Sequence, residues 1–183
     1  MKLMFASDIH GSAYYCERLM KCFEKEEPEK LILLGDLLYH GPRNDLPKGY
    51  NPKEVIQMLN EKKDDILCVR GNCEAEVDQM VLEFPIMSDS ILLYIDGITI
   101  FATHGHLFHE EKLPPIGDKD ILIHGHTHVQ AIRKMKKGMY LNPGSVSIPK
   151  EGNKNSYMVY KNGTFIIKSL EGEVIKEWKY AFE

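Results

Sequence analysis

Seven side chains in this sequence have oxygen or nitrogen donors of the kind that bind divalent metals, and each closely follows a short apolar run: Asp8, His10, Asp36, Asn72, His104, His126 and His128. Carboxylate, amide and imidazole donors suit Mn²⁺, Fe, Zn²⁺ or Ni²⁺ better than ions that prefer thiolates. Seven donors are too many for one tetrahedral ion, whereas two ions about 3.5 to 4 Å apart that share a carboxylate would use them all. The donor set therefore predicts a two-metal centre, which is a standard arrangement for in-line displacement at phosphorus.

Five apolar runs must position these donors, and each has the length of one buried strand: residues 2–7, 31–34, 66–71, 98–103 and 120–125. In open α/β sheets, ligands bind at the carboxyl ends of the strands. We therefore expect the donors to converge although they lie far apart in the sequence. Asp36 follows the run 31–34 and is the predicted centre of the site.

The first part of the chain alternates predicted strands and helices. Apolar residues recur at helical spacing before Pro28, which predicts an amphipathic helix: Tyr15, Leu19, Cys22 and Phe23. A second helix is predicted over about 52–62, with Asn51 as its N-cap and Glu54 three residues further on. The strands that these helices connect are expected to pair in parallel.

From about residue 91 the pattern changes to hairpins. Asp96-Gly97 separates two apolar runs, and Asn162-Gly163 separates two more. Further turns are predicted at 136–138 and 171–172. The second half should therefore be mostly antiparallel, and its apolar faces need a second sheet to cover them. We predict an α/β fold with two sheets packed face to face and helices outside, in one domain spanning residues 1–183.

Composition sets outer limits on function. The chain has 183 residues, 43% of them hydrophobic, and a net charge of −4. This charge predicts no nucleic-acid binding surface, and no apolar run reaches the roughly 20 residues that a membrane helix needs. The four cysteines lack C-x-x-C spacing and no export signal is recognised, so reduced thiols and a cytoplasmic location are expected.

Five motifs occur in a fixed order: Asp8-Ile9-His10, Gly35-Asp36, Gly71-Asn72-Cys73-Glu74, Thr103-His104-Gly105-His106 and Gly125-His126-Thr127-His128. This set resembles the calcineurin-like metallophosphoesterases and, among them, the small bacterial phosphodiesterases of the YfcE type. The resemblance covers residues 1 to about 150. It implies a four-layer α/β/β/α sandwich of two mixed β-sheets flanked by helices. It also implies metal-dependent hydrolysis of a small phosphodiester.

The same resemblance implies a role for each donor. Asp36 bridges two divalent ions, the first ion is held by Asp8, His10 and His128, and the second is held by Asn72, His104 and His126. Mn²⁺ is the expected ion, with Fe, Zn²⁺, Ni²⁺ and Co²⁺ as alternatives. A water or hydroxide bound between the ions would attack phosphorus in line. Catalytic roles are thereby predicted for Asp8, His10, Asp36, Asn72 and His104.

Other residues near the motifs are candidates for substrate contact. Arg43 and His40 lie in a loop that follows the strand 31–34, and His106 follows a predicted ligand, although ordinary surface roles would also explain them. The motif of the wider family usually has histidine where this chain and the YfcE-type enzymes have cysteine, Cys73 here, which leaves the general acid unassigned. His124 lies within a strand and is predicted to be a buried support rather than a ligand.

Three functions are compatible with this sequence. A phosphodiesterase is the first, and a phosphomonoesterase on the same dinuclear site is the second, because the ions alone do not set the number of ester groups. The third is a protein-interaction scaffold that resembles the retromer subunit, and it predicts lost ligands. All seven donors are present here, which favours an enzyme. The resemblance also suggests a homodimer.

Overall fold

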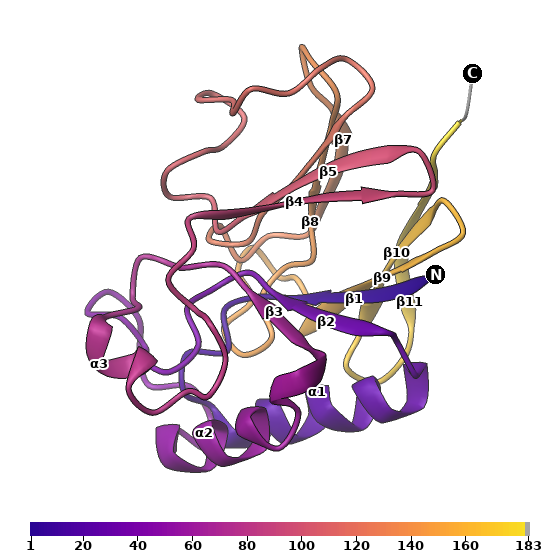
Figure 1. Ribbon diagram of the computed structural model, residues 1–183. Coiled ribbons are helices and arrows are strands. Elements are labelled where there is room, and N and C mark those ends of the chain that lie inside the picture. The colour runs from indigo at the N-terminus through magenta and orange to yellow at the C-terminus, as the bar shows by residue number, and fades with distance from the viewer. Residues whose placement is uncertain (182–183) are drawn as a thin grey trace.

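The computed structural model describes residues 1–181, which form two mixed β-sheets facing each other (Figure 1). The strands of the first sheet are β1 (Lys2–Ala6), β2 (Lys30–Leu33), β3 (Ile66–Cys68), β9 (Ser156–Lys161), β10 (Thr164–Ser169) and β11 (Val174–Lys179). The strands of the second sheet are β4 (Ser90–Ile95), β5 (Ile98–Thr103), β6 (Ile121–Ile123), β7 (Ala131–Lys134) and β8 (Met139–Asn142). Their orders are β11-β10-β9-β1-β2-β3 and β4-β5-β6-β8-β7.

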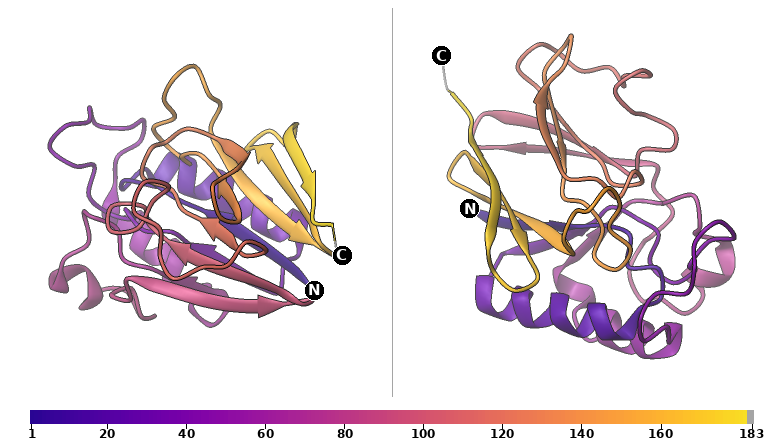
Figure 2. Two further views of the ribbon diagram at one scale, coloured as in Figure 1. Left: turned by 90° about the horizontal axis from the view of Figure 1, so that it is seen from above. Right: turned by 180° about the vertical axis from the view of Figure 1, so that it is seen from behind.

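The main helices are α1 (Ala13–Glu26) and α2 (Pro52–Asn60), and both cover the outer face of the six-stranded sheet (Figures 1 and 2). A 3₁₀ turn (Lys63–Asp65) and the short α3 (Glu76–Gln79) follow. The predicted capping box of α2 does not form. The side-chain amide of Asn51 donates to the Glu54 carboxylate at 2.7 Å instead of capping the backbone, and the helix ends at Asn60.

Two apolar cores hold the layers together. Side chains alternate along β1, so that Met4 belongs to the core under the helices and Phe5 to the core between the sheets. On β2, Leu31 and Ile32 divide in the same way. Burial of both faces explains why these strands appear in the sequence as continuous apolar runs.

Strand pairing confirms most of the predicted topology. β1, β2 and β3 pair in parallel, and the pairs β4–β5, β7–β8, β9–β10 and β10–β11 are antiparallel. β5–β6 and β6–β8 are parallel pairs, which the turn signals did not predict. The long connection 104–120 leads back from the end of β5 to the edge of the sheet where β5 begins, so that β6 runs parallel to β5. Phe108 in this connection packs against Phe101 of β5, with ring centroids 5.6 Å apart. The two mixed sheets and the α/β class are therefore as predicted. The connection 104–120 lies against the outer side of the second sheet.

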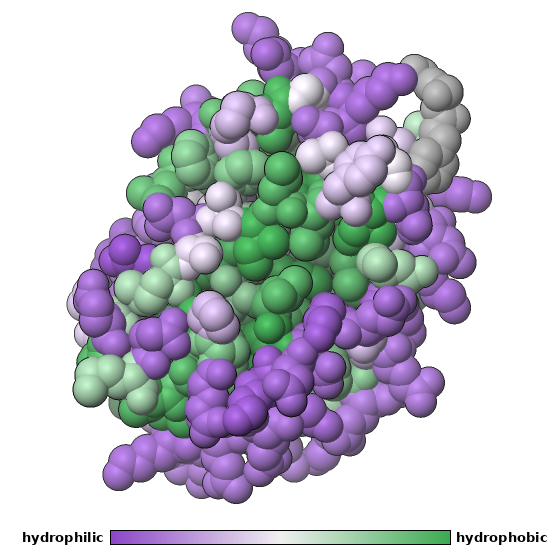
Figure 3. All heavy atoms as spheres, viewed as in Figure 1, coloured by the Kyte–Doolittle hydropathy of each residue, from purple (hydrophilic) through white to green (hydrophobic). Residues whose placement is uncertain are grey.

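One side of the molecule is apolar where the edges of the two sheets meet. Figure 3 shows hydrophobic side chains gathered across the middle of this face. Leu67 on β3 is 37% exposed, and Leu92 and Tyr94 on β4 are 66% and 78% exposed. They line a groove of about 470 Å³. Within residues 1–181, no helix is long and apolar enough to cross a membrane.

Candidate active site

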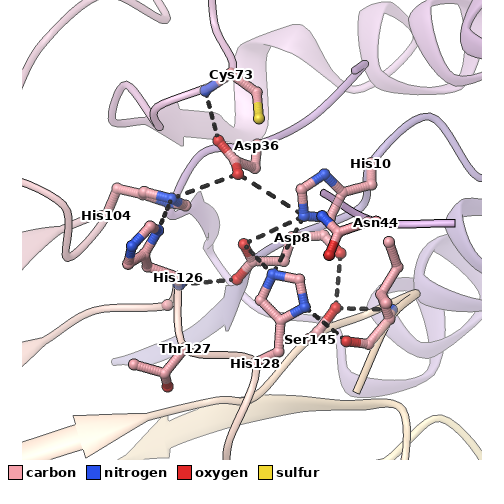
Figure 4. A network of polar contacts seen from close by, with 12 residues as sticks. Asp8, His10, Asp36, Asn44, Cys73, His104, His126, Thr127, His128 and Ser145 are labelled. Carbon is pink, nitrogen blue, oxygen red and sulfur yellow. Dashed lines mark hydrogen bonds and ion pairs between the residues drawn. The ribbon is translucent and has the colours of Figure 1, made fainter. Parts of the chain in front are cut away.

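All seven predicted donors lie together at the carboxyl ends of the strands. Hydrogen bonds between backbone groups join the loops that follow β1 and β2, from the Asp8 N–H to the Gly35 carbonyl at 3.1 Å and from the His10 N–H to the Asp36 carbonyl at 2.9 Å. The loops that follow β3, β5 and β6 bring the remaining donors to the same place. Figure 4 shows six of these side chains converging on one space, including the carboxylates of Asp8 and Asp36.

Five of the seven donors have left-handed backbone conformations: Asp8 (φ 60°), His10 (φ 50°), Asp36 (φ 55°), His126 (φ 64°) and His128 (φ 62°). This region is rare for residues other than glycine and costs on the order of 1 kcal/mol or more for each residue. Such strain persists only where the surrounding structure imposes it. Because five of the seven candidate donors carry this strain, the fold holds these side chains in position at a cost in local stability.

Three of the donors surround one position. Asp8 Oδ1 lies 3.2 Å from His128 Nε2 and 3.6 Å from His10 Nε2, and the two imidazole nitrogens lie 3.3 Å apart. All three residues are buried. A single cation between these atoms would be within reach of all three.

The other donors surround a second position, and Asp36 lies between the two. Its Oδ2 is 3.7 Å from His10 Nε2 and 3.5 Å from His104 Nε2. His104 Nε2 is in turn 3.1 Å from Asn72 Oδ1 and 3.1 Å from His126 Nδ1. Asp36 Oδ2 therefore lies within 4 Å of an imidazole nitrogen from each group of donors.

Three of the four imidazoles are held by backbone carbonyls, with their Nε2 atoms directed at the other donors. The Nδ1 atoms of His10, His104 and His128 lie 2.8, 2.6 and 2.6 Å from the backbone carbonyls of Tyr39, Leu34 and Ile148. Because a carbonyl only accepts, each Nδ1 carries a proton, and in the neutral imidazole each Nε2 then presents a lone pair. The lone pairs of His10 and His128 thus face each other at 3.3 Å.

The donor atoms of Asp8, His10 and His128 are suited to surround a cation. Asp8 Oδ1 is buried and accepts no hydrogen bond from residues 1–181. A buried carboxylate oxygen and facing lone pairs are unfavourable unless a cation lies among them. The donor set therefore fits a bound metal ion, and its oxygen and nitrogen atoms fit divalent transition metals.

The pKa values follow the same electrostatics. Burial would raise the pKa of Asp8, but the imidazoles of His10 and His128 outweigh this effect and hold the pKa well below its usual range. Burial would lower the pKa of His10, but Asp8 outweighs it and raises the pKa. At His126, burial and the neighbouring His104 lower the pKa to about 4. The centre therefore favours a positive charge beside the carboxylates and keeps His126 neutral for binding.

Glu74, Ser145 and Ser147 support the donors through contacts that the sequence did not predict. The buried carboxylate of Glu74 accepts three backbone N–H groups, from Gly71 at 2.5 Å, Leu37 at 2.7 Å and Asp36 at 2.9 Å. The hydroxyl of Ser145 donates to the Asp8 carbonyl at 2.9 Å, and Ser147 does so at 3.0 Å. Glu74 directly follows Asn72-Cys73 in the sequence, but its spacing alone does not indicate that it binds backbone N–H groups.

A cleft of about 380 Å³ opens over the donors, and only one of the three predicted substrate-contact residues lines it. Arg43 lines the cleft together with its neighbour Asn44. Lys150 also lines it and was not predicted from the sequence. His40 is not among the lining residues, since its ring packs against Tyr39 and Tyr50 with centroid distances of 4.7 and 5.4 Å. His106 lines a second cleft, which shares His126 and Thr127 with the first.

Cys73 and His124 both lie beside the donors. Burial raises the pKa of the Cys73 thiol above its usual range, and the nearby Asp36 carboxylate raises it further, so this group is a neutral thiol. Its backbone N–H donates to Asp36 Oδ1 at 2.9 Å. His124 is buried and packs on Tyr140 with ring centroids 4.4 Å apart, which agrees with the prediction of a buried support.

Comparison with known proteins places this geometry in a family. The model for the calcineurin-like phosphoesterase superfamily domain matches residues 1–164. The chain is 46% identical over 175 residues to the phosphodiesterase YfcE of Escherichia coli K12, an alignment that covers 96% of this chain and 95% of YfcE. The solved structure of that E. coli phosphoesterase superimposes with a TM-score of 0.96 over 99% of this chain and all of its own. Vps29 of Entamoeba histolytica in complex with Zn²⁺ shares the fold, with a TM-score of 0.61, 18% identity and coverage of 99% and 100%.

Proposed function

The chain belongs to the calcineurin-like phosphoesterase superfamily, and we propose that it is a metal-dependent phosphodiesterase with two divalent ions in its centre. The position of Asp36 Oδ2 between His10 Nε2 and His104 Nε2, at 3.7 and 3.5 Å, is the observation that carries this proposal. One carboxylate in contact with two groups of donors is the arrangement that a two-metal phosphoesterase requires.

We propose that each donor keeps the role that its position supports. The first ion would be held by Asp8, His10 and His128, the second by Asn72, His104 and His126, and Asp36 would bridge them. When bound, the ions supply Lewis-acid chemistry, which makes water a better nucleophile and neutralises charge on the phosphoryl oxygens. The backbone carbonyls that hold the Nδ1 protons keep each Nε2 free for binding. Arg43, on the wall of the cleft, would orient the substrate phosphate.

We propose Mn²⁺ as the most effective ion, with Fe, Zn²⁺, Ni²⁺ or Co²⁺ as alternatives. Carboxylate, amide and imidazole donors support this choice, since such sets do not discriminate sharply among these ions.

A small phosphodiester is the proposed substrate. The cleft of about 380 Å³ supports a small molecule, and the relative that aligns over 95% of its length is named a phosphodiesterase. Phosphomonoester hydrolysis on the same centre is tested by the experiment below. A purely structural scaffold is disfavoured, because all seven donors converge.

Three further proposals concern the protein as a whole. We propose that residues 1–183 act as one domain in the cytoplasm, where the free thiols of Cys16, Cys22, Cys68 and Cys73 would stay reduced. We also propose a homodimer in which the two copies of β4 pair edge to edge. In support, β4 pairs only with β5 among the described strands, and its exposed Leu92 and Tyr94 contain no charge that would prevent pairing.

The central test is hydrolysis of bis(4-nitrophenyl) phosphate and of 4-nitrophenyl phosphate by protein that has been stripped of metal and then reloaded. Activity should require added Mn²⁺, exceed that on the monoester, and accompany two bound ions per chain. Asp36→Asn should lose metal and activity together, because it removes the bridging charge.

The control is Asp118→Asn, an exposed carboxylate that lines neither cleft at the centre, which should match the wild type. Full turnover without metal would contradict the proposal, as would an Asp36→Asn variant with two ions and normal turnover. Faster hydrolysis of the monoester would replace the diesterase with the phosphomonoesterase alternative.

A further inference from the structure

Two clefts border the candidate metal centre, and they meet at His126 and Thr127. The first, described above, carries the cationic side chains of Arg43 and Lys150. The second has a volume of about 390 Å³, and its lining includes His106, Glu110, Glu111 and His124. Since the shared residue His126 is a candidate ligand, a substituent on a phosphorus atom at the centre can extend into either cleft.

The second cleft contains two carboxylates and no lysine or arginine among its described lining residues. Glu110 pairs with Arg133, whose Nε donates to Glu110 Oε1 at 2.7 Å, and this ion pair fixes one carboxylate in the wall. Glu111 is exposed and has no ion-pair partner within residues 1–181. The lining that the structure describes therefore contains carboxylates and histidines, in contrast to the cationic first cleft.

His124 adds an acceptor that lacks a donor. Its side chain is 2% exposed, and its Nδ1 donates to the Gly125 carbonyl at 3.0 Å, so its Nε2 presents a lone pair. That Nε2 is buried and has no partner in the described part of the chain, and neither has the buried Nδ1 of His106. A buried acceptor without a donor costs about 1 to 3 kcal/mol. A ligand that donates hydrogen bonds in this cleft would remove this cost.

We propose that the second cleft binds the ester substituent that is not displaced, and that this substituent carries hydroxyl or ammonium donors, as a polyol or an amino alcohol does. The inference rests on the proposed phosphodiesterase function and adds the substrate class. Glu111 and His124 accept the donors, and an apolar substituent leaves both without partners. Sites built around such hydrogen bonds reject analogues that lack the donor.

The test compares three 4-nitrophenyl phosphodiesters with one leaving group, in which the second alcohol is 1-propanol, glycerol or ethanolamine. With Mn²⁺-loaded protein, and after subtraction of the rate without enzyme, kcat/KM for the glyceryl or aminoethyl ester should exceed that of the propyl ester about tenfold or more. A larger gain for glyceryl identifies a polyol, and a larger gain for aminoethyl identifies an amino alcohol.

Variants assign the preference to the cleft. His124→Phe keeps a ring against Tyr140 but removes the acceptor, and Glu111→Gln removes the charge. Each should reduce the preferred-to-propyl ratio about fivefold or more, a ratio that cancels any change in overall activity. Glu151→Gln, an exposed carboxylate outside both linings, should leave the ratio unchanged.

The outcomes separate this inference from the function on which it rests. Hydrolysis of bis(4-nitrophenyl) phosphate with equal kcat/KM for the three esters would overturn the subsite and leave the phosphodiesterase intact. Failure to hydrolyse any diester would overturn the phosphodiesterase. Inhibition of the wild type provides a readout that needs no variant. If the subsite favours polyols, glycerol 1-phosphate should inhibit about tenfold more tightly than propyl phosphate. If it favours amino alcohols, phosphoethanolamine should inhibit about tenfold more tightly than propyl phosphate. Equal inhibition by all three would also overturn the subsite.

Discussion

The carboxylate of Glu74 accepts a hydrogen bond of 2.9 Å from the backbone N–H of Asp36, and this contact joins the loop that follows β3 to the loop that follows β2. The same carboxylate holds the N–H groups of Leu37 and Gly71. Glu74 thus fixes the backbone from which Asp36 extends between the two groups of donors. It is a positioning residue, since its own oxygens are occupied by backbone groups.

Glu74→Gln should weaken both the fold and the metal centre. The glutamine amide replaces one accepting oxygen with an NH₂ donor, so at least one of the three backbone N–H groups loses its acceptor. The free energy of unfolding should therefore fall by about 1 to 3 kcal/mol. Metal should be lost at a lower chelator concentration than in the wild type, as measured by EDTA titration with metal analysis. Glu76→Gln, an exposed neighbour on α3, is the matched control. Unchanged stability and metal retention would show that Glu74 does not position the centre.

Cys73 should limit the range of leaving groups. Its neutral thiol is a weak donor, whereas a histidine can protonate a departing oxygen, an effect worth about 10²-fold or more. Cys73→His should therefore raise turnover, most of all for the poorest leaving groups, and Cys73→Ser should not. The measurement is a plot of log kcat against leaving-group pKa for a series of phosphodiesters, with the metal content of each protein checked. Parallel lines for wild type and Cys73→His would contradict this role.

Stability in acid should depend on Glu26, a buried carboxylate far in sequence from the donors. Burial would raise the pKa of Glu26, but hydrogen bonds and charges from Lys168 and Lys2 outweigh it and lower the pKa from 4.5 to about 2. Because the folded state has the lower pKa, the stabilisation is complete above about pH 4.5 and disappears as the pH falls towards 2. Its size is about 3 kcal/mol at most.

The measurement is the free energy of unfolding of wild type and Glu26→Gln in EDTA between pH 7 and pH 2.5. The variant should be less stable at pH 7, and the difference should shrink below pH 4.5, where the wild-type carboxylate begins to lose its advantage. Glu24→Gln, on the exposed side of the same helix, should change stability by less than about 1 kcal/mol. A wild-type advantage that is constant with pH would show that the charge of Glu26 is not its cause.

The edge of β4 should govern assembly. Leu92→Lys with Tyr94→Lys places two charges on an exposed strand edge, so the pairing proposed for the homodimer should be lost. Sedimentation should show a dimer for the wild type and a monomer for the variant. Val174→Lys, on the exposed β11 of the other sheet, should remain a dimer. A monomeric wild type, or a variant that stays dimeric, would rule out this interface.

The sequence by itself determined the donor set and most of the local structure. Apolar runs that end in Asp8, Asp36, Asn72 and His104 predicted strands with ligands at their ends, because residues buried on both faces leave a continuous apolar signal. Glycine-containing turns such as Asp96-Gly97 predicted the hairpins, since the required left-handed conformations restrict the residue types. Periodicity predicted the helices but not their ends, as the missing side-chain cap at Asn51 shows.

Only the tertiary structure decided which groups meet. The parallel pairing of β6 with β5 and β8 depends on where the connection 104–120 returns, and no local signal encodes that. The 3.3 Å approach of His10 and His128 joins residues 118 positions apart. Glu74 resembles any other acidic residue in the sequence until three backbone N–H groups from two loops surround it. Spacing specifies which side chains a strand end can present, whereas packing of the two sheets specifies their distances, because contacts between distant segments exist only in the folded chain.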